Sequence, residues 1–297
     1  MGFIEYAMAA TEHGTDVEGR GARVCIFADG DAIVAGEVVT NYADGCCDVP
    51  IDVVSDSKIP GWIGSDTDCI LLSCTGESRD LVRVYDGLRR RGCRVFCISP
   101  DGWLLERCRR DGIRPVTMPS DLRMAEGIGA ALGALCRMIQ DLGVCDACDR
   151  LRSVLSSFED DGPDRAEGIA DSLRSKVPSF YSQSSISACS NYWKRAFNRV
   201  AGGPAFHGEL PEFDHNELVG WADPNDHAKD LLAVAFDGGG DELTSSLSAL
   251  MSDVLDINGR EVLTVAVKGS DPMEENIDGI VLGERVMAVI AGEGGMP

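Results

Sequence analysis

The stretch that decides the fold is residues 68–78, Asp-Cys-Ile-Leu-Leu-Ser-Cys-Thr-Gly-Glu-Ser, where a short apolar run ends in a turn rich in hydroxyl groups. The apolar run shows no polar alternation, as expected of a strand buried on both faces of a parallel sheet. Residues 79–91 then repeat apolar side chains on one face of a helix: Leu81, Val84, Tyr85 and Leu88. The stretch therefore predicts a strand, a tight turn and an amphipathic helix, the repeating unit of an α/β sheet.

The same unit recurs on both sides of that stretch. Further strands are expected at 24–28, 51–56, 94–99, 114–119, 230–236 and 261–269. Helical patterns lie between them, so we predict the α/β class with two domains, each a parallel sheet flanked by helices in three layers. The expected parts are an N-terminal helical segment at 1–21, a first domain at 22–142, a helical connector at 143–182 and a shorter second domain at 183–297.

The chain is strongly acidic, with 49 Asp and Glu against 27 Lys and Arg and a formal charge of −22. Nucleic acid is not expected as a partner, because phosphate backbones bind clustered cations. No apolar run reaches the roughly 18 residues that cross a membrane, and no secretory signal begins the sequence, so we expect a cytoplasmic protein. The charge fits either a solubilising surface or adaptation to high internal salt, and composition leaves both open.

All 12 cysteines lie within residues 25–189. Several fall in apolar runs, where cysteine acts as a small hydrophobic residue. Cys145 and Cys148 form a single CxxC, and neither a second pair nor a histidine is close to it in the sequence. We therefore expect no disulfide framework, no metal site and no cofactor.

The turn after the buried strand carries the most chemistry. Ser73, Thr75 and Ser78 can turn their hydroxyl groups toward one oxyanion, and Gly76 allows close approach of the backbone. The following helix would present unpaired N–H groups and the positive end of its dipole. Serine and threonine also cap helices, so the spacing alone leaves helix capping and phosphate binding open.

Four motifs in the same order resemble a known family. SCTGESRDL (73–81) resembles the loop S-x-S-G-x-T-E-E-T of sugar isomerase (SIS) domains. Residues 89–119 and 120–135 resemble the stretches that follow this loop in the family. In the second domain, HNELVGW (215–221) resembles the H-N-E-I-x-G-W signature of the bifunctional phosphoglucose/phosphomannose isomerases.

This resemblance implies a reaction and a set of site residues. Family members interconvert an aldose 6-phosphate and fructose 6-phosphate through a cis-enediol, without a metal or cofactor. The resemblance places the phosphate on Ser73, Thr75, Gly76 and Ser78, Arg123 near the enediolate, and His215 at ring opening. It also implies a hexose 6-phosphate as ligand, and a homodimer with the active site at the subunit interface, where the histidine comes from the neighbouring subunit.

Three departures affect the catalytic residues. Arg199 stands where the family has its catalytic glutamate, and arginine cannot act as a base at neutral pH. In the first loop, Asp31 follows Gly30 where the family has serine, so a carboxylate would form part of the site wall. The last lysine is Lys268, so the lysine of the family's C-terminal helix is missing.

Two functions therefore stay open. One is an aldose–ketose isomerase acting on glucose 6-phosphate, mannose 6-phosphate and fructose 6-phosphate, with Glu209 or Glu212, expected in a loop, as a replacement base. The other is a phosphosugar-binding protein that has lost its chemistry. A different SIS activity, such as amino-sugar isomerisation or a sugar-phosphate lyase, is a third and weaker option. Fold alone cannot choose between them.

Overall fold

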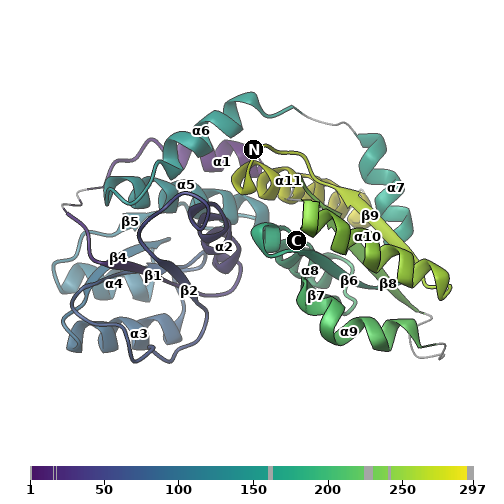
Figure 1. Ribbon diagram of the computed structural model, residues 1–297. Coiled ribbons are helices and arrows are strands. Elements are labelled where there is room, and N and C mark those ends of the chain that lie inside the picture. Colours follow the sequence, from purple (N-terminus) through teal and green to yellow (C-terminus); the bar gives the residue numbers. More distant parts are fainter. Residues whose placement is uncertain are drawn as a thin grey trace. The chain divides into compact units, whose positions relative to one another are not determined.

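The structure is a computed structural model that describes residues 2–15, 17, 19–159, 163–223, 230–239 and 242–292 (Figure 1). The contacts within it divide the chain into two compact units, Met1–Phe158 and Glu159–Pro297. The division falls inside the segment expected to connect the domains. Of the two helices expected there, the first packs on the first unit and the second packs on the second.

The first unit alternates strands and helices. Its elements are α1 (Phe3–Ala10), β1 (Arg23–Ala28), α2 (Ala32–Ala43), β2 (Ile51–Val54), β3 (Thr67–Leu72), α3 (Arg79–Arg90), β4 (Arg94–Ser99), α4 (Trp103–Arg110), β5 (Val116–Thr117), α5 (Met124–Asp141) and α6 (Ala147–Ser157). The sheet is parallel throughout, in the order β2-β1-β3-β4-β5. The predicted α/β class is confirmed.

Helices cover both faces of this sheet. Alternate residues of β1, such as Cys25 and Phe27, join the core beneath α3 and α4. The residues between them face the other way, where Gly36 of α2 lies against Ile26. Every residue of β3 is buried, as its unbroken apolar run predicts.

The strand order creates a topological switch point at the carboxyl edge of the sheet. The chain leaves β1 for β2 on one side and returns to β3 on the other, so β1 and β3 are neighbours whose following loops diverge. The register pairs Ala28 with Leu72 at their carboxyl ends. Open α/β sheets bind ligands at such a switch point, which puts the predicted 73–78 turn at the favoured position.

The second unit repeats this plan with a smaller sheet. Its elements are α7 (Pro163–Leu173), β6 (Val177–Gln183), the short 3₁₀ helix η1 (Ser184–Ile186), α8 (Ser187–Val200), β7 (Phe206–Leu210), α9 (Glu212–Ala222), β8 (Leu231–Asp237), α10 (Glu242–Ile257), β9 (Val262–Ala266) and α11 (Pro272–Ala291). The parallel order is β7-β6-β8-β9. Phe180, Trp193 and Phe236 form its aromatic centre, with ring centroids 5.1–6.2 Å apart.

Three elements of this unit were not predicted. Strand β6 occupies a segment expected to be helical connector, because its sequence VPSFYSQ mixes proline, serine and glutamine with the apolar residues. Strand β7 and helix α9 occupy a segment expected to be loop. The sequence FHGEL is too polar to stand out as a strand, and α9 buries only Phe213 and Trp221. Among the described residues, no helix combines the length and apolar character needed to span a bilayer.

Two glycines of α5 let α1 pack with its backbone against α5. A Cβ on Gly129 would collide with the carbonyl oxygen of Phe3, and a Cβ on Gly133 with that of Ala7. Both Phe3 and Ala7 are buried. The glycines are therefore required by close approach of two helices, although glycine is a poor residue for a helix interior.

We predict that Gly133→Ala destabilises the protein by about 1–3 kcal/mol, because α1 must move away, even though alanine favours the helix. The matched control is Gly127→Ala in the same helix, where a Cβ would meet only ordinary contacts at 3.7–3.9 Å. That change should be neutral or stabilise by up to about 1 kcal/mol. Urea unfolding measures both, and equal effects of the two changes would contradict the packing argument.

Candidate functional site

The turn after β3 is built by hydroxyl oxygens that accept backbone N–H groups. Ser73 Oγ accepts from the amides of Thr75 and Gly76, at 3.3 and 3.2 Å. Thr75 Oγ1 accepts from the amide of Glu77 at 3.4 Å. These bonds use lone pairs of the oxygens and leave the hydroxyl protons unused in them.

Ser78 starts α3 as its N-cap residue. Its Oγ accepts from the amide of Leu81 at 3.2 Å, which satisfies one of the otherwise unpaired amides of the first turn. Thr75 is exposed and Ser78 is partly exposed, whereas Ser73 is fully buried. The ligand-accessible hydroxyls of the turn are therefore those of Thr75 and Ser78, while Ser73 shapes the turn from inside.

Two glycines bring a second helix start against this turn. Gly76 has φ +74°, and a Cβ there would lie 2.8 Å from the carbonyl oxygen of Pro100. A Cβ on Gly102 would lie 2.6 Å from the Gly76 carbonyl oxygen, which itself accepts from the Leu104 amide at 3.4 Å. The N-termini of α3 and α4 thus lie side by side, and their dipoles favour an anion near the turn.

Arg79 adds a cation that the sequence analysis missed. It is the first residue of α3, and its guanidinium lies 5.0 Å from the ring centroid of Trp103, the first residue of α4. The cation–π contact holds a positive charge beside the two helix starts. Its position directly after Ser78 was the signal that could have identified it.

The loop after β1 forms the neighbouring wall. The Asp29 amide donates to the Leu72 carbonyl at 3.4 Å, which fixes the two loops side by side. Gly30 is exposed with φ +52°, and Asp31 follows as the partly buried N-cap residue of α2. The structure therefore brings Gly30 and Asp31 to the same sheet edge as the turn, with a carboxylate where an anionic ligand would meet repulsion.

Arg123 lies at the N-cap position of α5 and is paired with Glu126. Its Nη2 and Nε donate to Glu126 Oε1 at 2.5 and 3.0 Å, and its amide donates to Oε2 at 3.0 Å. The Arg123 guanidinium lowers the pKa of the buried Glu126 carboxyl. A Cβ on Gly127 would lie 3.7 Å from the Cys74 side chain, so this helix start reaches the turn. Arg123 is thus held near the turn by its own helix.

Two cavities of the first unit lie away from the turn. One of 630 Å³ extends from His13 to the β5 segment, and one of 260 Å³ lies between α1 and the end of β5. Neither is lined by residues 73–78. The turn is the stronger candidate for an anion site, because an anion held by helix starts and hydroxyls needs hydrogen-bond donors rather than a deep apolar cavity.

The other predicted residues belong to the second unit, and their setting differs from the expectation. Glu209 lies in β7, and Glu212 and His215 lie in α9, so these three residues are not in a loop. All three are exposed. Arg199, in the last turn of α8, is exposed as well. The structure therefore places them on regular elements that fix their backbones.

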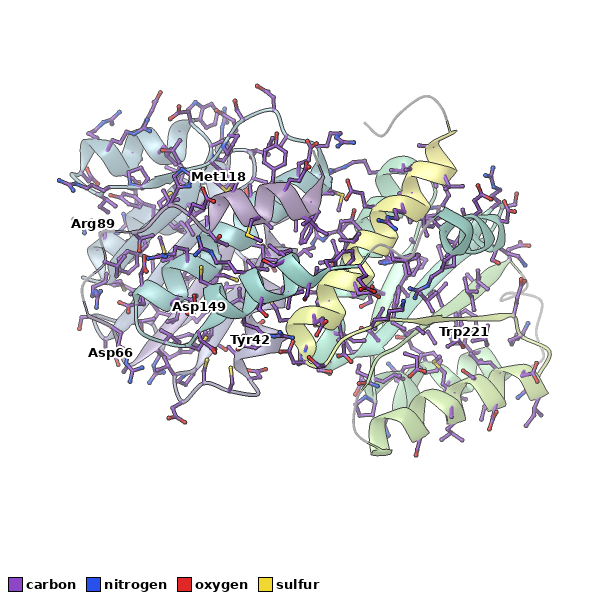
Figure 2. All side chains as sticks on the ribbon, turned by 90° about the horizontal axis from the view of Figure 1, so that it is seen from above. Tyr42, Asp66, Arg89, Met118, Asp149 and Trp221 are labelled. Atoms are coloured by element: carbon purple, nitrogen blue, oxygen red, sulfur yellow. The ribbon has the colours of Figure 1, made fainter. Side chains whose placement is uncertain are left out.

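Hydrogen bonds explain two residues of the HNELVGW motif. Tyr181 of β6 donates its hydroxyl to Glu217 Oε2 at 2.6 Å, and Trp221 Nε1 donates to the same tyrosine oxygen at 3.2 Å (Trp221 is labelled in Figure 2). Phe213 packs against this tyrosine with ring centroids 4.4 Å apart. Glu217 and Trp221 therefore fasten α9 to the sheet, which is a structural role.

Asp214 is a second residue that the sequence analysis missed. Both of its carboxylate oxygens are buried and have no hydrogen-bond partner among the described residues. Burial raises the pKa of its carboxyl, and the neighbouring His215 opposes that shift. A buried carboxylate without partners costs stability, and such groups are concentrated at functional sites.

The sequence of this chain is similar to those of known sugar-phosphate isomerases. Residues 163–293 match the family described as bacterial phospho-glucose isomerase C-terminal SIS domain. The chain is 26% identical to the bifunctional phosphoglucose/phosphomannose isomerase of Aquifex aeolicus over 193 residues, and 23% identical to that of Caldicellulosiruptor bescii over 214 residues. These matches support a diverged member of this family.

The alignments of this SIS protein with its relatives are partial. They cover 63% and 68% of this chain, and 58% and 63% of the two relatives. Solved structures give the fold over nearly the whole chain. The C-terminal domain of glucosamine-fructose-6-phosphate aminotransferase from Francisella tularensis matches with a TM-score of 0.73, 13% identity and coverage of 97% of this chain and 94% of that one. Tagatose-6-phosphate ketose/aldose isomerase from Escherichia coli matches with a TM-score of 0.64 and 12% identity, and the match covers 97% of this chain and 85% of that one.

His207 of β7 gives this SIS protein a pH-dependent stability. Burial lowers the pKa of its ring to about 4, and the charges of Lys194 and Arg195 act in the same direction. The unfolded chain then takes up a proton below pH about 6.5, whereas the folded chain does so only near pH 4. Stability should therefore fall as the pH decreases through this window.

We predict a loss of about 1–2 kcal/mol between pH 7 and pH 4.5 that depends on His207, less than the full shift implies because the ring is partly exposed. His207→Gln should flatten the profile of unfolding free energy against pH, while His215→Gln on the exposed face of α9 serves as control. Parallel profiles of wild type and His207→Gln would show the assignment to be wrong.

Proposed function

We propose that this protein binds a hexose 6-phosphate and isomerises glucose 6-phosphate, mannose 6-phosphate and fructose 6-phosphate through an enediol, as a cytoplasmic homodimer. The observation that carries the proposal is the turn 73–78 at the switch point of the first sheet. There, the Thr75 and Ser78 hydroxyls and two helix starts offer donors to an anion. The family of the chain supports the same ligand class.

The phosphate is proposed to bind at the turn without a lysine. A phosphate oxygen accepts hydrogen bonds from Thr75 and Ser78, Gly76 allows the close approach, and Arg79 supplies the opposite charge. Ser73 holds the turn in shape through its two amide contacts. Gly30 and Asp31 form the neighbouring wall, where sugar hydroxyls can donate to the carboxylate and so offset its repulsion of the phosphate.

The catalytic groups proposed on this basis come from both units. Arg123 stabilises the enediolate, since its guanidinium is held by Glu126 at the helix start beside the turn. His215, contributed by a second subunit, opens the sugar ring. Glu209 and Glu212 are candidate bases, and Asp214 joins them because its carboxylate is buried beside His215 with a raised pKa.

A binding protein without catalysis is the second candidate. Two observations favour it: Arg199 occupies the position of the family's catalytic glutamate, and Asp31 places a carboxylate beside the proposed phosphate site. Such a protein would keep the turn and its affinity for the sugar phosphate. Turnover therefore decides between the two candidates, and binding does not.

The anchor is tested with Thr75→Val, which removes the hydroxyl and keeps the shape of the side chain. Calorimetry with fructose 6-phosphate should give a roughly tenfold or greater loss of affinity, because a hydrogen bond to a charged group contributes about 1.5–3 kcal/mol. Ser157→Ala, at the end of α6, is the control and should bind as wild type does. Unchanged affinity of Thr75→Val would show that the Thr75 hydroxyl does not bind the phosphate.

The base is tested with Asp214→Asn in a coupled assay of fructose 6-phosphate formation. If Asp214 moves the proton between C1 and C2, turnover should fall by about 10²–10⁴-fold. The same change should leave stability at pH 7 equal or higher, because it removes a buried ionised carboxylate. Glu209→Gln and Glu212→Gln test the other two candidate bases in the same assay. Full activity of Asp214→Asn would exclude it, and wild-type binding without turnover would favour the second candidate.

A further inference from the structure

Three cysteine thiols from two distant segments of the first unit converge. Cys46 and Cys47 lie in the turn after α2, which ends at Ala43, and Cys145 lies between α5 and α6. Their sulfur atoms all lie within 4.8 Å of one another. Cys46 is exposed and the other two are partly buried, so the group is open to solvent on one side.

Local hydrogen bonds hold the two segments in this arrangement. The amides of Cys46 and Cys47 both donate to the Ala43 carbonyl, at 3.0 and 2.8 Å, which folds the end of α2 into a tight turn. Tyr42 donates its hydroxyl to Asp146 Oδ1 at 2.7 Å, directly beside the thiols (Tyr42 is labelled in Figure 2). This contact joins Tyr42, four residues before Cys46, to Asp146, the residue after Cys145. The two segments that carry the thiols are therefore fixed to each other.

The spacing of the sulfurs fits a metal ion. Cys46 Sγ and Cys47 Sγ are 3.8 Å apart. A zinc–sulfur bond of about 2.3 Å in tetrahedral geometry places two ligand sulfurs about 3.8 Å apart. The thiols of Cys47 and Cys145 are also within hydrogen-bonding reach of each other. Little movement would therefore place all three sulfurs around one ion.

We propose that Cys46, Cys47 and Cys145 form a binding site for a soft, thiophilic cation of the Zn²⁺ class. Three sulfur ligands select such cations over Mg²⁺ or Ca²⁺, which prefer oxygen. The fourth coordination position faces solvent on the side of the exposed Cys46 and is left for water or a small exogenous ligand. Binding would release the thiol protons to solvent, since thiolate is the coordinating form.

The contacts favour a metal over a redox pair. Cys46 and Cys47 are adjacent in the chain, so their Cα atoms are about 3.8 Å apart, below the roughly 4.4–6.8 Å range of ordinary disulfides. Cys148, the other half of the CxxC, is fully buried and its Sγ lies 4.0 Å from the Thr11 carbonyl oxygen, outside the group of three. The site is thus distinct from the CxxC that the sequence displays.

The predicted result is one Zn²⁺ per chain, measured on the reduced full-length protein by competition with a chromophoric chelator. Cys145→Ser should weaken binding by more than about 100-fold, because even outer-shell changes cost about 10–100-fold. Cys46→Ala, a change at an exposed residue, should do the same without disturbing the fold. Cys74→Ser, a partly exposed thiol elsewhere in the first unit, is the matched control and should keep one equivalent.

Two further readouts separate this site from adventitious binding. Co²⁺ should give a sulfur-to-metal charge-transfer band that Cys145→Ser abolishes and Cys74→Ser retains. Zn²⁺ should raise the unfolding temperature of wild type and leave that of Cys46→Ala unchanged, since only a bound ion stabilises the folded state. Equal Zn²⁺ affinity of wild type and Cys145→Ser overturns the proposal. Loss of two titratable thiols on air oxidation with no metal binding also overturns it and identifies a redox pair.

Discussion

The carboxyl edge of the first sheet depends on one turn, in which Ser73 accepts two amides and Gly76 lies against the backbone of Gly102. The buried serine fixes how the chain leaves β3. The glycine contact then brings the starts of α3 and α4 together, and only a residue without a side chain allows it. The placement of Thr75, Ser78 and Arg79 follows from this arrangement. A strongly acidic chain thereby gains a local group of donors, although its overall field repels anions.

The groups named in the proposed function are distributed unequally over the two units. The first unit carries the hydroxyl donors of the turn and a guanidinium fixed by Glu126, so the proposed binding of a sugar phosphate would require little rearrangement there. The second unit carries the buried carboxylate of Asp214 and the exposed His215. Arg199 stands where the resemblance to the family predicts the catalytic glutamate. If chemistry persists, the loss of that carboxylate must be compensated by another group, and Asp214 is the acidic residue whose environment is most unusual.

The sequence predicted those elements whose buried residues form an unbroken run or a regular spacing along the chain. Strand β3 and helix α3 could be predicted because the run 69–72 is uniformly apolar and α3 repeats its apolar side chains at helical spacing. Strand β6 was missed because buried Ser179, Ser182 and Gln183 interrupt its apolar character. Ser182 is tolerated inside because its hydroxyl and that of Ser190 lie 2.9 Å apart and hydrogen-bond to each other.

Site features that depend on distant segments could not be predicted. The hydroxyls of the turn stand close together in the sequence and were found. The burial of Asp214, the pairing of Arg123 with Glu126 and the meeting of Cys46 with Cys145 depend on three-dimensional packing. In the sequence Cys145 is paired with Cys148, but Cys148 is buried near the start of α6 and the structure brings Cys145 to Cys46 and Cys47 instead.

Helix α1 belongs to the core although it precedes the sheet. Its backbone fills the groove left by Gly129 and Gly133, and Phe3 is almost fully enclosed. A fragment that starts at β1 would leave that groove open to water along α5. A fragment meant to contain the first unit alone should therefore start before Phe3. A bulky fusion placed directly at that residue would interfere with the packing of α1 against α5.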